Sequence, residues 1–148
     1  MASKSEEEFR RLNMELRLLE QTAEALQSRM NMINSAVADL TYAQMTLDGL
    51  EKENEKSELL VPIGGTSYIR AKLDNPDKII VGMGAGVSVE KTRQEAKEII
   101  KNRQQDLDKA KTSVQQQFAQ VAEKINQDRE RIEALVAAAR EGKTQQDV

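Results

Sequence analysis

The stretch that decides the fold is LLVPIGGTSYIRAKLDNPDKIIVGMGAGVSVEKT, which occupies residues 59–92. It contains both prolines of the chain, Pro62 and Pro76, and most of its glycines. Short apolar runs alternate with turn-forming residues, which is the pattern of short strands joined by tight turns. The stretch therefore predicts two β-hairpins, with strands at residues 58–63, 66–73, 78–81 and 87–90.

The three glycines at positions 82, 84 and 86 follow an apolar run and so resemble a nucleotide-binding loop. A dinucleotide fingerprint requires G-x-G-x-x-G with its third glycine opening a helix, but Val87 and Val89 stand at the two positions where that glycine would fall. The residues that follow alternate as in a strand. The glycines are therefore assigned to turns, and no cofactor is expected; the predicted turn glycines are Gly64, Gly65, Gly82, Gly84 and Gly86.

The segments on both sides favour helix and begin with capping boxes, Ser5 to Glu8 and Thr92 to Glu95. Heptad rows follow, which predict a coiled coil. In the first helix one row is Leu12, Leu19, Leu26, Ile33, Leu40 and Leu47, and the other is Phe9, Leu16, Ala23, Met30 and Val37. In the second helix one row is Ile100, Leu107, Val114, Val121 and Leu135, and the other is Phe118, Ile125, Ile132 and Ala139. If the chain folds back on itself, the residue numbers of facing heptad positions should add up to a nearly constant value, and in these rows they do. The rows therefore predict that the two helices pair antiparallel within one chain, although Leu19 then faces Asp128.

The predicted fold class is α+β, a long antiparallel two-helix coiled coil with two β-hairpins inserted between the helices. Residues 1–57 form the N-terminal coiled-coil helix, 58–91 the two hairpins, 92–141 the C-terminal coiled-coil helix and 142–148 a flexible tail. Two hairpins alone are marginally stable and expose strand edges, so we expect them to form part of an oligomeric β-barrel. The residues expected in that interface are Val61, Ile63, Tyr68, Ile69, Ile79, Val81, Val87 and Val89.

Composition narrows the possible functions. The 148 residues include no Cys and no His, which removes thiolate and imidazole metal sites, Cys nucleophiles and His-based triads. The net charge of −3 does not indicate a basic surface of the kind that binds nucleic acid. No apolar run approaches the roughly 20 residues that span a bilayer. We expect a cytoplasmic protein that is not an enzyme, binds no metal and contacts neither nucleic acid nor membrane, although carboxylate chemistry remains open.

The block 59–92, with LVPIG before the first hairpin and VGMGAGVSVEK leading into the second helix, resembles the prefoldin alpha subunit. The resemblance implies a jellyfish-shaped hexamer of two alpha-type and four beta-type subunits, joined through a β-barrel body. It also implies an ATP-independent chaperone, a holdase that captures unfolded polypeptides at the coiled-coil tips and delivers them to a group II chaperonin.

By the same resemblance, the client-binding positions lie near both chain ends, at Phe9, Leu12, Met14, Leu16, Leu18, Leu135 and Val136. Met14 and Leu18 fall outside the predicted seam. They are either scattered surface residues or an adaptable apolar surface for varied clients. The alternative function is a structural coiled-coil adaptor that oligomerises through its hairpins and holds no client.

Overall fold

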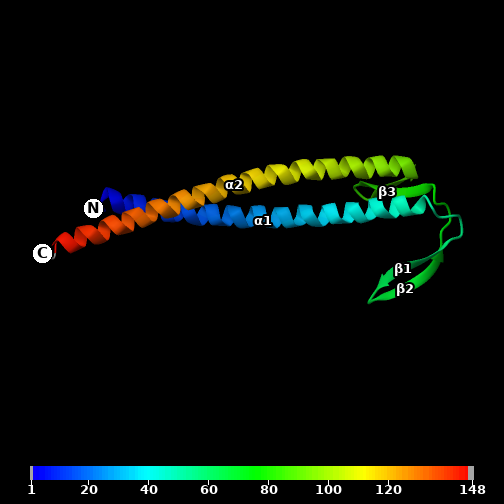
Figure 1. Ribbon diagram of the computed structural model, residues 1–148, viewed down its shortest axis with the longest axis horizontal. Helices are drawn as coiled ribbons and strands as arrows, with labels where there is room; N and C mark the ends of the chain where they lie inside the picture. Colours follow the sequence, from blue (N-terminus) through cyan, green and yellow to red (C-terminus); the bar gives the residue numbers. More distant parts are fainter. Residues whose placement is uncertain (1, 147–148) are drawn as a thin grey trace. The chain divides into compact units, whose positions relative to one another are not determined.

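The computed structural model describes residues 2–146 and shows two long helices that are connected in the chain by two antiparallel hairpins (Figure 1). The elements are α1 (Lys4–Leu50), β1 (Glu58–Gly64), β2 (Ser67–Lys72), β3 (Lys78–Gly84), β4 (Val87–Thr92) and α2 (Arg93–Gln146). This order confirms the predicted fold class of helix, two hairpins and helix. The β-barrel would be a property of an assembly and stays a prediction.

Each of the two helices ends at a different residue from the one that the predicted domain limits gave. α1 ends at Leu50, and the segment that follows contains turns at residues 51–52 and 55–56, with Lys56 at a φ of 67°. α2 continues to Gln146, through residues 142–146, where a flexible tail was expected. Gly142 takes helical backbone angles there, and Glu141 and Lys143 are good helix formers, so nothing ends the helix at that point. Residues 147–148 lie outside the described residues.

The N-terminal cap of α1 lies two residues earlier than predicted. Glu6 N donates to Ser3 Oγ at 3.3 Å, and Ser3 N donates to Glu6 Oε2 at 3.2 Å, which is the reciprocal pattern of a capping box. The Ser5 to Glu8 assignment was wrong because both serines are followed three residues later by Glu, and the helix begins at Lys4, directly after Ser3. The cap of α2 is as predicted, with Glu95 N donating to Thr92 Oγ1 at 3.1 Å.

The two hairpins repeat each other in register. Glu58 pairs with Lys72 and Val61 with Ile69 in the first, as Lys78 pairs with Thr92 and Val81 with Val89 in the second. Both registers shift just before the turn, where Gly64 and Gly84 have φ values of 102° and 99°. Such angles favour glycine, so these two glycines serve the turns as expected.

The described chain divides into two compact parts. The terminal part contains the chain up to Asn34 and from Lys109 onward, and the hairpin part is Ser35–Asp108. In the hairpin part, Leu47 of α1, Val81 of β3, and Ala96 and Ile100 of α2 form a buried cluster. Hairpin β3–β4 is therefore packed on the helices of its own chain.

The terminal part has a seam of buried heptad residues, which are Leu12, Leu26, Ile33, Val114 and Ile125. Asp128 interrupts this seam on α2 and is only 2% exposed. Lys124 Nζ lies 3.0 Å from Asp128 Oδ1, whereas Asp128 Oδ2 has no hydrogen-bond partner among the described residues. Leu19, expected to face Asp128, is half-buried. The seam thus contains one buried, incompletely satisfied carboxylate.

We predict that Asp128→Leu stabilises the chain by about 1–4 kcal/mol, because a buried charge is replaced by an apolar side chain of similar size. Lys124 would not be stranded, since its side chain is 46% exposed and its Nζ also lies 3.4 Å from Glu15 Oε1. Urea unfolding followed by circular dichroism measures the change. Glu130→Leu, at an exposed position of the same helix, is the control and should change stability little. A loss of stability in Asp128→Leu would contradict the prediction.

Candidate functional site

A groove lies at the end of the terminal part, where the first turns of α1 meet the last turns of α2. Its volume is about 570 Å³. We call it the terminal groove; its walls are Ser5, Glu6, Phe9, Arg10, Leu135, Val136, Ala139, Arg140 and Lys143. The apolar side chains come from both helices, so neither helix alone forms this surface.

The terminal groove brings together three of the seven predicted client-binding residues, Phe9, Leu135 and Val136. Phe9 is 38% exposed although it belongs to a heptad row, because the seam is not closed over it at this end. Leu12, by contrast, is buried in the seam and offers no surface to a client. Leu16 is half-buried and does not line the groove.

Met14 and Leu18 lie outside the terminal groove, with 68% and 64% of their surface exposed. Their outward positions were predicted from the heptad pattern. The groove also contains charged residues that the sequence prediction missed, Arg10, Arg140 and Lys143. The helical spacing of Glu6 to Arg10 and of Ala139 to Lys143, four residues each, was the signal that could have placed them on one face.

An ion pair fastens the two helices beside this groove. Arg131 donates two hydrogen bonds to Glu8, from Nε to Oε1 at 2.8 Å and from Nη2 to Oε2 at 3.1 Å. The hydrogen bond from Arg131 holds the pKa of Glu8 below its ordinary value of 4.5. A second pair links Arg129 Nη2 to Glu20 Oε1 at 3.0 Å. These pairs link the two helices from which the groove is built and favour their register.

The hairpins present a different surface, made of exposed apolar side chains. Of the eight predicted interface residues, six are exposed, which are Val61, Ile63, Tyr68, Ile69, Val87 and Val89. Ile79 is half-buried and Val81 is 6% exposed, and both pack in or against the cluster of the hairpin part. The prediction of Val81 as an interface residue was therefore wrong, because its strand face covers the chain's own helices. Ile80 on the opposite face is 77% exposed and was missed.

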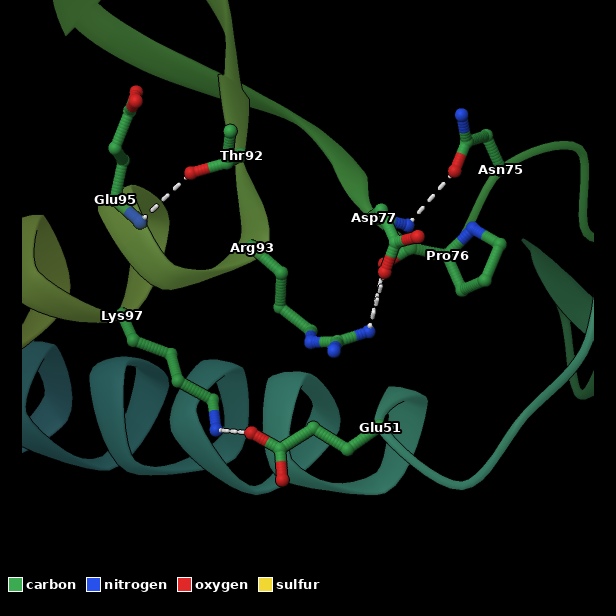
Figure 2. Close-up of polar contacts among 8 residues, drawn as sticks. All are labelled: Glu51, Asn75, Pro76, Asp77, Thr92, Arg93, Glu95 and Lys97. Carbon is green, nitrogen blue, oxygen red and sulfur yellow. Dashed lines mark hydrogen bonds and ion pairs between the residues drawn. The ribbon is translucent and has the colours of Figure 1, made fainter.

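Polar contacts at the start of α2 hold hairpin β3–β4 in place (Figure 2). Arg93 Nη1 lies 3.0 Å from Asp77 Oδ1, and Asp77 N donates to Asn75 Oδ1 at 2.9 Å. Lys97 pairs with Glu51 and also with Asp48, whose Oδ1 lies 2.9 Å from Nζ. The hydrogen bonds to Glu51 and Asp48 raise the pKa of Lys97 above its ordinary value. Farther along α2, Arg103 Nη2 donates to the carbonyl oxygen of Gly82 at 2.6 Å. The contacts of Arg93 and Arg103 thus connect α2 to β3 and to the turn before it.

Comparison with known proteins shows which protein family has this architecture. The family model described as "Prefoldin subunit" matches residues 19–138, which include both hairpins and most of each helix. The chain belongs to the prefoldin family.

Its similarity to other prefoldin subunits extends over most of the chain. It is 36% identical to a prefoldin subunit alpha of Methanosarcina barkeri over 74% of this chain and 78% of that one. It is 32% identical to the prefoldin subunit alpha of Methanococcoides burtonii, over 84% and 91%. A solved structure of a filamentous prefoldin from Methanocaldococcus jannaschii matches with a TM-score of 0.69 and 25% identity, over 78% of this chain and 95% of that one.

The likeness to the prefoldin alpha subunit predicted from residues 59–92 is thus confirmed. The chain is a subunit of the prefoldin type of chaperone, and it assembles with other prefoldin subunits. Within residues 2–146, neither helix has a stretch long and apolar enough to cross a membrane. The terminal groove and the hairpin faces both present accessible apolar side chains.

We predict that Glu8→Gln lowers the melting temperature at neutral pH by removing the charge-assisted pair with Arg131. Because the folded-state pKa of Glu8 lies below its unfolded value, the contribution is fully present above the unfolded pKa of about 4.5 and is lost as the pH falls through the folded pKa. Melting curves of both proteins, recorded from about pH 7 to about pH 3, should therefore converge at the acidic end.

The control for this series is Glu24→Gln on the same helix, whose side chain is exposed. It should follow the wild type at every pH. A melting difference for Glu8→Gln that persisted unchanged at the acidic end would show that the ion pair is not its cause.

The repeated register of the hairpins supplies a matched pair of variants. Val81→Ala should lower the free energy of unfolding of the isolated chain by about 1–3 kcal/mol, because it removes buried methyl groups. Val61→Ala, at the equivalent and 41% exposed position of β1, should leave that free energy nearly unchanged. Val61→Ala should instead weaken assembly with other prefoldin subunits, measured by native mass spectrometry. Equal destabilisation of the isolated chain by both variants would contradict this assignment.

Proposed function

We propose that this chain is the alpha-type subunit of a prefoldin hexamer with two alpha and four beta subunits, which holds unfolded polypeptides without ATP. The terminal groove is the client-binding surface, and the hexamer delivers its clients to a group II chaperonin in the cytoplasm. The single observation that carries the proposal is the groove itself, where Phe9, Leu135 and Val136 form an accessible apolar surface at the end of the helix pair.

The chemistry of the groove suits reversible holding. It offers apolar side chains for contact, and its walls contain no Cys, no His and a single carboxylate, that of Glu6. The proposed role is therefore binding without turnover. One such surface binds weakly, but several subunits acting on one polypeptide gain affinity because later contacts are intramolecular. Weak individual contacts also allow release to a second chaperone.

The exposed residues of α1 support an extended client surface. Met14 and Leu18 present flexible apolar side chains to solvent, a type of surface that can repack against varied partners. We include them in the client-binding surface as secondary contacts. Leu12 is left out because it is buried.

The hairpins support assembly with beta-type subunits. Each hairpin is a separate two-stranded sheet, so every strand has one unpaired edge. Hairpin β3–β4 is packed on its own helices through Val81, whereas the equivalent Val61 of hairpin β1–β2 is exposed. Hairpin β1–β2 is accordingly the element that gains most from a partner, and we propose that a beta-type subunit covers it.

The experiment compares client holding by the assembled complex with variants of this chain. Phe9→Ser combined with Val136→Ser should weaken suppression of aggregation of a denatured, unrelated protein by several-fold in the absence of nucleotide. The reason is the loss of apolar contact area from the groove. Light scattering of the client measures the effect, and native mass confirms that the hexamer is intact.

The matched control is Tyr42→Ser combined with Met45→Ser, which removes two exposed apolar side chains from the hairpin part of α1. Holding should survive in this control. Met14→Ser with Leu18→Ser should give an intermediate loss. A wild-type complex that fails to suppress aggregation would favour the structural adaptor, and full activity of the groove variant would remove the terminal groove from the proposal.

A further inference from the structure

The walls of the terminal groove carry an uneven charge. Arg10, Arg140 and Lys143 contribute three cations, and Glu6 contributes one carboxylate, which leaves an excess of positive charge. The chain as a whole has a net charge of −3. The groove therefore has a local net charge opposite in sign to that of the whole chain, and its apolar side chains are accessible.

The one carboxylate is already engaged. Glu6 Oε2 accepts a hydrogen bond from Ser3 N at 3.2 Å as part of the capping box. It also lies in the first turn of α1, where the positive end of the helix dipole offsets a negative charge. Glu6 thus weakens the positive field of the groove less than a free carboxylate would.

Two of the cations have no partner among the side chains that the structure describes. The Arg10 guanidinium and the Lys143 ammonium form no hydrogen bond or ion pair with any of those side chains. They come from different helices, so the apolar floor of Phe9, Leu135 and Val136 has a cation from each helix beside it. Arg140 adds its charge to the same rim but has another interaction within the chain.

We propose that the terminal groove selects apolar client segments that are flanked by acidic residues. This inference rests on the proposed function, since the occupant is a segment of an unfolded client. When an apolar side chain enters the groove, its neighbours in the extended segment lie at the rim, within about 8–10 Å of the cations, where charges still interact at physiological salt. Acidic neighbours are attracted there and basic neighbours are repelled.

The charged rim decides which segment binds, and the apolar floor supplies the common affinity. Exposed ion pairs contribute little each, and like charges brought together oppose binding. Specificity is the difference between the affinities for acidic and for basic segments. It therefore arises from rejection of basic segments as well as from attraction of acidic ones. Segments with neutral flanks should bind with intermediate affinity.

The test uses three fluorescent peptides that share a Leu-Phe-Val core and have glutamates, glutamines or lysines on both sides. Binding to the assembled complex is measured by fluorescence anisotropy at low and at high salt. The glutamate peptide should bind about 3- to 10-fold more tightly than the lysine peptide at low salt, and the difference should shrink as salt rises.

Variants of the rim make the test specific. Arg10→Gln with Lys143→Gln should remove most of the preference, and Arg10→Glu with Lys143→Glu should reverse it. Arg29→Glu with Lys109→Glu is the matched control, with the same charge change at exposed positions of the terminal part that do not line the groove. The preference should persist in this control, and the glutamine peptide should bind the control and the wild type similarly.

The possible failures are distinct. If the three peptides bind the wild type equally, or if the control loses the preference as the rim variants do, the charge selection is overturned and the proposed client groove is untouched. If none of the peptides binds, and Phe9→Ser with Val136→Ser also leaves aggregation suppression unchanged, the proposed function of the groove itself fails.

Discussion

The narrow apolar seam between α1 and α2 is the constraint on which the rest of the structure depends. Aromatic residues make up only 3% of the chain, so no bulky core is available, and the buried residues of the terminal part are aliphatic heptad positions such as Leu26, Ile33 and Val114. A seam of this kind stabilises the helices only while they stay paired in register. Ion pairs such as Glu8 with Arg131 and Glu20 with Arg129 border the seam and favour that register.

The seam also determines what is left for binding. Where the seam is closed, as at Leu12, the apolar side chains are buried between the helices. Where the helices reach their ends, the same heptad rows supply Phe9 and Leu135 to an accessible groove. Packing and the accessible groove thus use one sequence pattern, and position along the helix decides whether a heptad residue is buried or accessible. Asp128 is the exception within the seam, because a buried carboxylate contributes to neither.

The hairpins show a comparable division between two nearly identical elements. Both have the same register and the same turn geometry, yet β3 is fixed to the helices by Val81 and by the bond from Arg103 to the carbonyl oxygen of Gly82. The corresponding face of β1 carries Val61, which remains exposed. Hairpin β3–β4 is therefore part of the subunit's own core, whereas the corresponding face of hairpin β1–β2 is left uncovered.

The sequence by itself determined the order of elements, because heptad spacing and turn chemistry are local signals. It predicted two long helices, the hairpins within residues 58–91, the cap at Thr92 and the turn role of Gly64 and Gly84. It could not choose between Ser3 and Ser5 as the N-terminal cap, because both satisfy the same short pattern.

Only the tertiary structure decided which chemically equivalent residues are buried and which are free. Val61 and Val81 stand in the same sequence context, and the packing of β3 on α1 and α2 is what separates them. The terminal groove was likewise hidden, since Arg10 and Lys143 are far apart in sequence and become neighbours only where the two helix ends meet. The register of the folded helices determines which residues of distant segments lie close together. The periodic pattern within one segment does not specify that register.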